Sequence, residues 1–338
     1  MQYSFFSAHP LLNPDVARQF FNEHQDTIVP YSDDLRTWIR HWIKTTSKKS
    51  NVNETIGRKK SALKETSLEF SFYQKLFQNF LGYRMYGDTN DDCHLIPKPA
   101  AQSIKISGEP DAVLGHFSDE PHSPIAVIEL KKPGTILDAP QPNYHNKSAV
   151  EQAFDYAKRM PSCRWVIVTD MREIRLYSAK SSDSFETFDL TDIDRSESTV
   201  EVLTRKLYFF LHRQHLIDGT DDSTVARLVK TSEHQQFSAQ EGFYEIYTQV
   251  RLDLLRQIES QVKSLSVAAD QRACIFATQR LLDRVLFIHF CEDHPDRLLP
   301  NDVLKDVVDR AVLMPGKSRS KAYSAVKGLF RDLDEGAN

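Results

Sequence analysis

Two short stretches of the sequence place charged side chains beside strongly apolar ones. In SGEPDAVLGHF, Asp111 follows Pro110, and further along IAVIELKKPG carries Glu129 and Lys131 within and just after an apolar run. Because side chains at positions i and i+2 of a strand point to the same face, Glu129 and Lys131 project together. If the two stretches pair as a hairpin, Asp111 lies beside them. Two carboxylates and a lysine, with backbone carbonyls nearby, form a hard-oxygen site suited to Mg²⁺.

These groups suit the hydrolysis of a phosphodiester bond. A bound metal ion neutralises charge on a phosphate and lowers the pKa of a bound water. Lys131 can orient or help to deprotonate that water, or it can stabilise the developing negative charge. An unpaired carboxylate in an apolar strand costs free energy, and a metal ion together with a lysine removes that cost.

A Glu-x-Lys triplet alone also fits an exposed charge pair on an edge strand. Three features of the context favour a site. The triplet ends a core strand, a Pro-Asp pair stands upstream, and a helix follows with Gln152 and Tyr156 one turn apart on one face.

Composition sets broad limits on the protein. The chain has 338 residues, of which 40% are hydrophobic and 27% charged, so we expect two or three globular domains. The net charge of −4 does not mark a nucleic-acid-binding protein, but such an enzyme needs only a local basic surface. No GxxxxGK[ST] motif occurs, so we expect no ATP hydrolysis by this chain.

The four cysteines are scattered, which is typical of reduced thiols in a cytosolic protein. No apolar run reaches the roughly 20 residues that span a bilayer, and the N-terminus lacks the features of a signal peptide. We therefore predict a cytoplasmic protein without a membrane segment.

Apolar periodicity predicts three parts of the chain. Residues 1–60 form an N-terminal extension with two short amphipathic helices within 10–46. A polar, basic stretch at 47–60 then serves as a linker or contacts a phosphate backbone. Residues 61–215 form an α/β domain with a mixed sheet, and residues 216–338 form an all-helical connector domain.

The α/β assignment depends on the order of the elements. A long amphipathic helix, several extended segments, a second helix and two further strands follow one another. Among them WVIVTD is almost continuously apolar, as in a central strand covered on both faces. The predicted elements are a helix at 61–82, strands near 95–96, 111–117 and 125–130, a helix at 148–160, strands at 165–170 and 173–178, and a helix at 199–214.

Taken together, GEPDAVLG, IAVIELKKPG, SAVEQAFDYA and WVIVTDMREIRLY resemble the PD-(D/E)XK nuclease superfamily. More narrowly, they resemble the N-terminal nuclease region of type IIG restriction–modification enzymes, which join endonuclease, methyltransferase and target recognition in one chain. The resemblance covers roughly residues 61 to 330, because the helical tail is similar to the connector of those enzymes. It implies a restriction-endonuclease-like mixed sheet flanked by helices, followed by an all-α domain.

The resemblance also implies roles for individual residues. Asp111 and Glu129 match the metal-binding carboxylates, and Lys131 matches the catalytic lysine. Gln152 and Tyr156 match a QxxxY element that positions the lysine or the phosphate.

A glutamate from the first helix is common in the superfamily. Glu69 is the first candidate for it and Glu65 the second, and a solvated charge on the helix face explains either residue equally well.

The function implied is a Mg²⁺-dependent endonuclease acting on double-stranded DNA in a restriction or phage-defence system, with Mn²⁺ as a possible substitute. No NPPY-type tetrapeptide or glycine-rich AdoMet loop occurs, so AdoMet is not expected to bind this chain.

Methyltransferase and target-recognition domains are expected in cis or in trans, and the chain is interpreted as the nuclease part of a longer enzyme or as a standalone nuclease. Since one site of this type cuts one strand, we expect a dimer on DNA. The alternative is a catalytically silent DNA-binding or assembly module, against which the intact carboxylate and lysine set argues.

One further cluster was considered as a zinc site. His289, Cys291, Glu292 and His294 lie in HFCEDH, but the histidines are five residues apart, roughly 140° around a helix, and do not converge. We interpret this stretch as the polar end of a connector helix.

Overall fold

The structure is a computed structural model that describes residues 10–52, 65–85, 93–99, 109–118, 123–194, 196–264, 270–293, 298–313 and 318–335. The chain divides into two compact units, Met1–Phe237 and Ser238–Asn338. The finer division at residues 60 and 215 stays a prediction.

A mixed sheet forms the centre of the first unit, as predicted. Neighbouring strands are antiparallel except for β3 and β4, which are parallel and are joined by the helix α4 (Ala149–Ala157). In the described part of the chain the strands, in sheet order, are β1 (Leu95–Pro97), β2 (Ala112–His116), β3 (Ser123–Leu130), β4 (Trp165–Thr169), β5 (Glu173–Ser178) and β6 (Phe185–Asp189).

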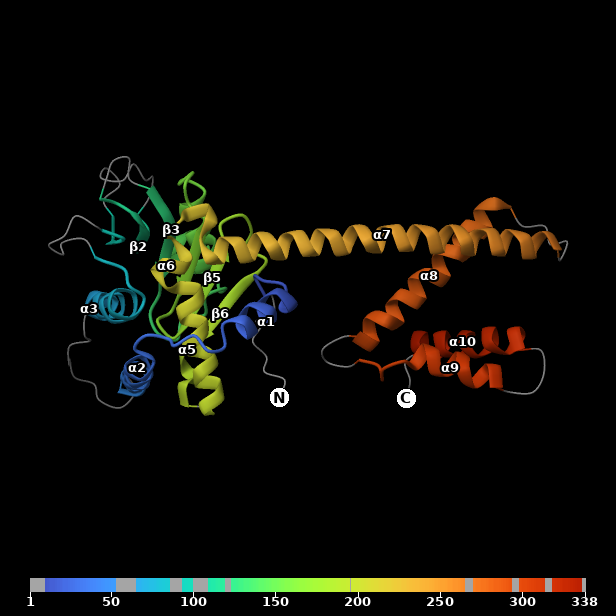
Figure 1. The fold of residues 1–338 in the computed structure, drawn as a ribbon, viewed down its shortest axis with the longest axis horizontal. Coiled ribbons are helices and arrows are strands. Elements are labelled where there is room, and N and C mark those ends of the chain that lie inside the picture. The colour runs from blue at the N-terminus through green and yellow to red at the C-terminus, as the bar shows by residue number, and fades with distance from the viewer. Residues whose placement is uncertain are drawn as a thin grey trace. The chain divides into compact units, whose positions relative to one another are not determined.

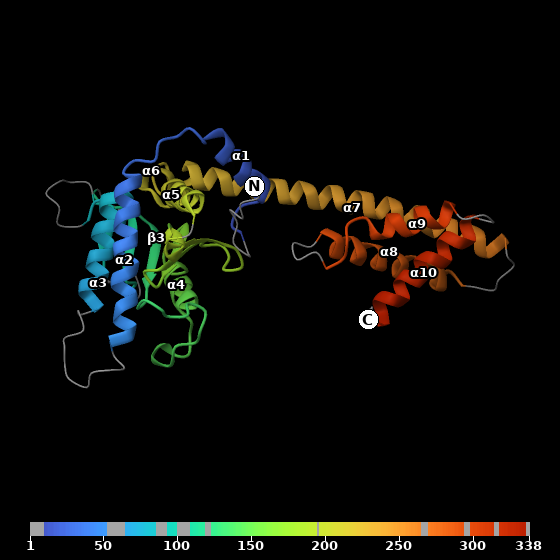
Figure 2. The ribbon, with the colours of Figure 1, turned by 90° about the horizontal axis from the view of Figure 1, so that it is seen from below.

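Helices cover both faces of this sheet. α2 and α3 lie side by side, and β3 lies between them and α4 in Figure 2 (Figures 1 and 2). The other elements of the unit are α1, α5, α6 and four short η segments, and α7 begins there. The bounds are α1 (Pro14–Glu23), α2 (Ser32–Val52), α3 (Glu65–Phe72), the π-helical η1 (Tyr73–Phe80), η2 (Pro142–Tyr144), η3 (Leu190–Asp194), α5 (Glu197–Leu211), α6 (Arg213–Leu216), η4 (Thr220–Asp222) and α7 (Thr224–Ser264).

The strand β3 is buried on both sides because its side chains alternate between two cores. Ala126 and Ile128 pack into the larger core with α1, α2, α3, η1 and α5. Val127 packs into the smaller core beneath α4. The period of two therefore leaves Glu129 on the α4 side of the sheet, as its position after Ile128 requires.

A glycine fixes the register of the hairpin that carries the site. The β2–β3 pairing shifts between Leu114 and Gly115, and a Cβ at Gly115 would come within 2.1 Å of the Ser123 carbonyl oxygen. Only glycine permits that approach. With Ala112 paired to Ile128, the residue before β2 stands opposite the end of β3.

Three elements differ from the prediction. Helix α2 extends to Val52, so residues 47–52 are helical rather than linker, while the rest of that predicted linker lies outside the described residues. The helix predicted at 61–82 changes to a π-helix at Tyr73, and its first four residues also lie outside the described part. The short edge strand β6 was not predicted from FETFD.

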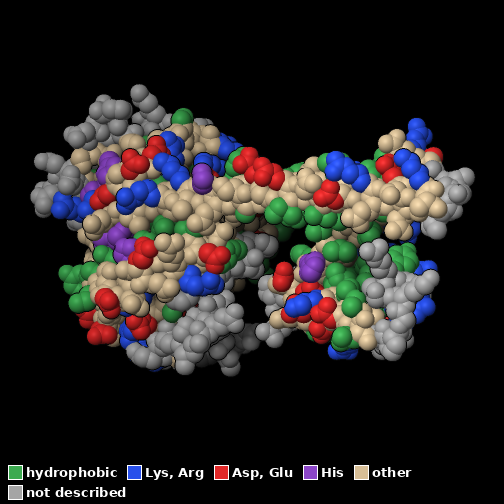
Figure 3. Space-filling model, turned by 45° about the vertical axis from the view of Figure 1, so that its right-hand side comes forward, with side chains coloured by type: hydrophobic (Ala, Val, Ile, Leu, Met, Phe, Trp, Pro, Cys, Tyr) green, Lys and Arg blue, Asp and Glu red, His purple; other side chains and the backbone are tan. Residues whose placement is uncertain are grey.

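The second unit is helical, as predicted. It contains the later part of α7 together with α8 (Gln271–Asp293), α9 (Val303–Leu313) and α10 (Ser318–Glu335), and α9 packs against α10. Apolar side chains gather on the surface of these helices (Figure 3). None of the helices in the described residues is both long and apolar enough to span a bilayer.

Glu292 makes two contacts at the polar end of α8. His289 Nδ1 lies 2.9 Å from Glu292 Oε2, and Glu292 Oε1 accepts a hydrogen bond from the backbone N–H of Leu304. His294 lies outside the described residues. Glu292 therefore joins α8 to α9.

Candidate active site

The two carboxylates of the predicted site are brought together by the β2–β3 hairpin. Asp111 precedes β2, and its Oδ2 accepts a hydrogen bond of 2.8 Å from the backbone N–H of Leu130. Glu129 is the penultimate residue of β3 and is almost fully buried. The hairpin thus fixes Asp111 beside the end of β3, as predicted from the spacing.

Lys131 follows β3 and is held by three groups. Its backbone N–H donates to the Thr169 carbonyl of β4 at 2.7 Å, which continues the parallel pairing. Its Nζ lies 2.7 Å from Glu129 Oε1 and donates to Gln152 Oε1 at 3.0 Å. Backbone and side chain are therefore both fixed, and the ammonium is directed toward Glu129.

The charges at this edge of the sheet are not balanced. Burial, followed by the negative charge of Asp111, raises the pKa of Glu129 to about 7, although Lys131 opposes the shift. The pKa of Asp111 is also raised, mainly by burial and further by Glu69, against the opposing effects of the Leu130 N–H and Lys131. A buried and a half-buried carboxylate, both with raised pKa values and beside one lysine, favour the binding of an additional proton or cation.

The helix α4 supplies the predicted Gln152 and Tyr156. Ser148 caps the helix in a capping box with Glu151, which fixes its first turn at the edge of the sheet. Gln152 is buried and bonds Lys131, as the preceding contacts show. Tyr156 is half-buried, and burial raises the pKa of its hydroxyl, followed by the negative charges of Glu129 and Asp111.

The structure places Glu69 at the same edge but gives it a different partner. Its Oε2 lies 2.8 Å from Lys98 Nζ, and both residues line a cleft of about 380 Å³ together with Asp111 and Lys131. Glu65 begins α3, and its side chain lies outside the described part of the structure. Glu69 is therefore a neighbour of the carboxylate pair, and its catalytic role stays a prediction.

Three residues near the site are not among the site residues predicted from the sequence, although the loop 144–148, which includes Tyr144, is a polar loop that could touch DNA. Tyr73 is buried, its hydroxyl has no hydrogen-bond partner among the described residues, and the charges of Asp111, Glu69 and Glu129 add to burial in raising its pKa. The spacing of one turn from Glu69 is a signal that was available for it. The other two are Gln141 and Tyr144, which line the cleft from the loop before α4.

The donor set fits a magnesium ion. Among the residues the structure describes, no three His, Cys, Asp or Glu side chains gather as a metal cage. Mg²⁺ does not require such a cage, because it is commonly held by one or two carboxylates and completes its shell with water and substrate oxygens. Asp111 and Glu129 can supply these carboxylates, and a cation beside them would relieve the repulsion that raises the pKa of Glu129.

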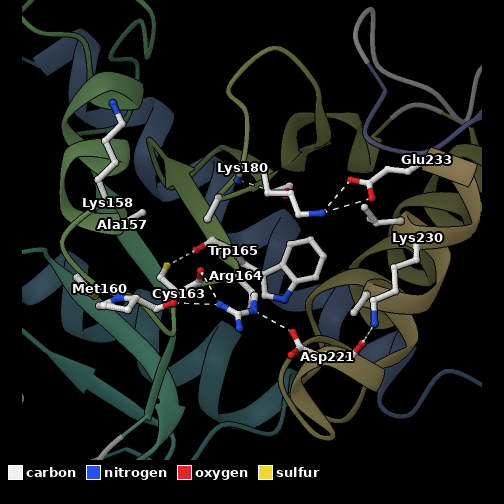
Figure 4. A pocket seen from close by; sticks show the side chains of 15 residues that line it. Ala157, Lys158, Met160, Cys163, Arg164, Trp165, Lys180, Asp221, Lys230 and Glu233 are labelled. Atoms are coloured by element: carbon white, nitrogen blue, oxygen red, sulfur yellow. Dashed lines mark hydrogen bonds and ion pairs between the residues drawn. The ribbon is translucent and has the colours of Figure 1, made fainter. Parts of the chain in front are cut away.

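A second cavity shows a contrasting use of charge. It has a volume of about 500 Å³ and lies at the first residue of β4, Trp165. Two of its cations face acidic partners: Arg164 Nε lies 2.8 Å from Asp221 Oδ1, and Lys180 Nζ lies 3.3 Å from Glu233 Oε1 (Figure 4). These pairs join strands β4 and β5 to η4 and α7, so we interpret the cavity as a structural junction.

Comparison with known families identifies the chain. The profile of the family described as MmeI, N-terminal domain, matches residues 51–266. The chain belongs to the MmeI N-terminal domain family. That match includes every predicted site residue from Glu69 to Tyr156.

The MmeI N-terminal domain is the N-terminal region of a type IIG restriction enzyme, so this part of the predicted resemblance is confirmed. The motifs indicated a range of roughly 61 to 330. The match starts earlier than this range, at residue 51, and it also ends earlier, at residue 266. Neither the curated proteins nor the solved structures yielded a match to the chain. Membership of the PD-(D/E)XK superfamily stays a prediction.

Proposed function

We propose that this MmeI N-terminal domain protein is a Mg²⁺-dependent endonuclease that hydrolyses phosphodiesters of double-stranded DNA, with the PD-(D/E)XK type of site. The observation that carries the proposal is the Lys131 ammonium, fixed 2.7 Å from the buried Glu129 carboxylate at the mouth of a cleft. The family points to a restriction-endonuclease-like enzyme, which agrees with this chemistry.

The roles of the side chains follow from their contacts. Asp111 and Glu129 would hold the metal ion, and Gln152 would keep Lys131 extended toward Glu129. A bound Mg²⁺ would supply charge neutralisation and a water of lowered pKa. Lys131 would orient that water or stabilise the developing negative charge.

Tyr156 and Glu69 would have supporting roles in the reaction. Tyr156 lies one turn after Gln152 on α4, and its hydroxyl is suited to orient a phosphate oxygen. Glu69 adds negative charge beside Asp111, and its partner Lys98 is exposed enough to contact a phosphate group instead.

The partners of such an enzyme follow from the same proposal. One site of this kind cleaves one strand, so double-strand cleavage would use two copies on DNA. Methyltransferase and target-recognition domains, in cis or in trans, would supply modification and sequence specificity. Mn²⁺ would serve in place of Mg²⁺, since both prefer oxygen ligands.

Supercoiled plasmid provides the direct test. We expect the purified chain to nick or linearise it in Mg²⁺, and we expect Lys131→Ala and a chelator each to abolish cutting. Lys180→Ala, which removes an exposed ion-paired lysine of the second cavity, is the matched control and should cut normally.

If the wild type does not cut, metal binding decides between the remaining alternatives. Calorimetric uptake of Mg²⁺ or Mn²⁺ that is lost in Asp111→Ala would support a nuclease that needs its partner domains. An absence of uptake would contradict the proposal and favour a catalytically silent DNA-binding or assembly module.

A further inference from the structure

The loop between β3 and α4 ends in a closed turn over the cleft. Gln141 N–H donates to the Lys147 carbonyl, Tyr144 N–H donates to the Gln141 carbonyl, and Lys147 N–H donates to the Tyr144 carbonyl, each at 3.0 Å. The 3₁₀ segment η2 lies within this ring of bonds. The segment, here named the Gln141–Lys147 turn, is therefore internally fixed.

Two residues of the turn have a positive φ. His145 and Asn146 have φ values of 56° and 58°, in the left-handed region that His and Asn enter more readily than most residues with a Cβ. These two residues reverse the direction of the chain between η2 and α4.

The turn is attached to the site through one side chain. Gln152 Nε2 donates to the Lys147 carbonyl at 3.2 Å, while its Oε1 accepts from Lys131 Nζ at 3.0 Å. One amide group thus holds both the turn and the lysine, so their relative position is determined.

The aromatic ring of the turn covers the lysine. Lys131 Nζ lies 4.2 Å from the centre of the Tyr144 ring, within the range of a cation–π contact. Tyr144 is 48% exposed, so its other face remains open to the cleft and to solvent. Together with Glu129 and Gln152, the ring encloses the ammonium on several sides.

The amide of Gln141 is a donor without an acceptor. Its Nε2 is buried, has no hydrogen-bond partner among the described residues, and belongs to a side chain that lines the cleft. The same cleft is lined by three lysines and two carboxylates, which are Lys98, Lys131, Lys132, Glu69 and Asp111. A buried N–H donor is suited to an acceptor oxygen such as that of a phosphodiester, because leaving it unpaired is unfavourable.

We propose that the Gln141–Lys147 turn is a substrate-binding element, in which Tyr144 positions the Lys131 ammonium and Gln141 donates to a phosphodiester oxygen of a nucleic-acid strand. The inference rests on the proposed nuclease function and adds two residues to it. Tyr144 acts through Lys131 and is a positioning residue, whereas Gln141 contacts the substrate.

The role of Tyr144 is tested by exchanging its ring. Tyr144→Phe keeps the ring and should keep kcat within about twofold, while Tyr144→Leu should lower kcat roughly tenfold with little change in KM. In the NMR spectrum, the Lys131 ε-methylene signal, assigned by its loss in Lys131→Met, should show a ring-current shift that Tyr144→Leu removes and Tyr144→Phe retains. Tyr244→Leu, on an exposed tyrosine of α7, is the matched control.

The role of Gln141 is tested by binding without cleavage. In Ca²⁺, a DNA duplex should bind Gln141→Leu roughly tenfold more weakly than the wild type, because a hydrogen bond to a charged oxygen is lost. Gln19→Leu, on an exposed glutamine of α1, should bind as the wild type does.

The outcomes separate this inference from the proposed function. A wild type that binds DNA but neither cuts it nor takes up Mg²⁺ or Mn²⁺, with binding weakened in Gln141→Leu and the ring-current shift lost in Tyr144→Leu, would support the turn and contradict the nuclease. Cutting by a wild type whose activity and binding are unchanged in both variants would support the nuclease and overturn the turn. A wild type that does not bind DNA would overturn the inference.

Discussion

Two buried lysine–carboxylate pairs lie in the first unit and differ in their surroundings. Lys131 Nζ is 2.7 Å from Glu129, with side chains 10% and 5% exposed, and Lys206 Nζ is 3.1 Å from Glu186, with side chains 9% and 2% exposed. Each lysine also lies near an aromatic ring, Tyr144 in the first pair and Phe188 in the second. As isolated pairs they are closely similar.

Their neighbours separate them. Glu186 has Lys206 and the backbone N–H groups of Leu12 and Leu11 to lower its pKa against the effect of burial, and Lys206 also donates to the Thr187 carbonyl. Among the described residues, the named causes of the Glu186 shift include no second carboxylate, whereas Asp111 raises the pKa of Glu129. Burial of an ion pair is thus weak evidence of function, and surplus like charge beside an open cleft is stronger evidence.

The largest expected effect comes from removing each lysine in turn. Lys131→Met should lower DNA cleavage by about 10³-fold, the usual scale for losing a group that assists proton transfer or stabilises charge. Lys206→Met should lower the free energy of unfolding by about 3–5 kcal/mol, because it leaves Glu186 buried and unpaired, but should leave cleavage by the folded protein unchanged. Plasmid cleavage and urea unfolding measure the two effects.

Both variants are expected to be destabilised, so activity must be normalised to the folded fraction. Equal losses of normalised activity in the two variants would mean that the comparison does not separate a site from a structural pair.

The next effect concerns pH and metal. The pKa of Glu129 is raised to about 7 in the folded chain, so the folded state binds more protons than the unfolded state between the ordinary value and 7. Without metal, the contribution of Glu129 to stability therefore falls as pH rises through this range. Because Mg²⁺ needs the ionised carboxylates, its effect on Tm should be larger at pH 8 than at pH 5.5.

Asp111→Asn is the control for this behaviour. It removes the charge that adds to burial in raising the pKa of Glu129, and it should abolish the Mg²⁺-dependent rise in Tm. A rise that persists in Asp111→Asn, measured by calorimetry, would place the metal elsewhere.

A smaller effect is expected for Glu69, whose charge raises the pKa of Asp111 from the other side of the cleft. Glu69→Gln should lower cleavage roughly tenfold and should lower the pKa of Asp111. Stability should hardly change, because the partner Lys98 is about half exposed. A loss as large as that of Lys131→Met would instead make Glu69 a member of the metal site.

The smallest effect is expected at the second cavity. Arg164→Gln removes the partner of Asp221, an exposed carboxylate, and should change neither cleavage nor Tm measurably. A clear loss of cleavage in this variant would show that the far end of β4 takes part in the reaction.

The central part of the site was predictable because it depends on strand periodicity. The alternation along β3 and the hairpin spacing place Asp111, Glu129 and Lys131 at one edge, and the helical spacing places Gln152 and Tyr156 nearby. The mixed sheet followed from the order of apolar runs for the same reason.

The remaining parts depend on tertiary contacts that leave no periodic signal. The closure of the turn over Lys131 depends on residues in left-handed conformations. A glycine would have indicated such a conformation in the sequence, whereas His145 does not. The π-helix that presents Tyr73 looks like an ordinary amphipathic helix in sequence. Nothing in the sequence distinguishes the buried Glu186 and Lys206 from the many exposed charges.

The order of the site residues along the chain has a consequence for how the protein can evolve. Glu129, Lys131, Gln152 and Tyr156 all lie within one continuous β3–α4–β4 segment, whereas Asp111 joins them only from the neighbouring hairpin strand. A single change at Asp111 would remove one carboxylate and leave the lysine, its amide partner and the covering turn in place. Under the proposed function, descendants of such a lineage would lose hydrolysis in one mutational step and keep the fold and the proposed DNA-binding surface, ready for selection as binding subunits.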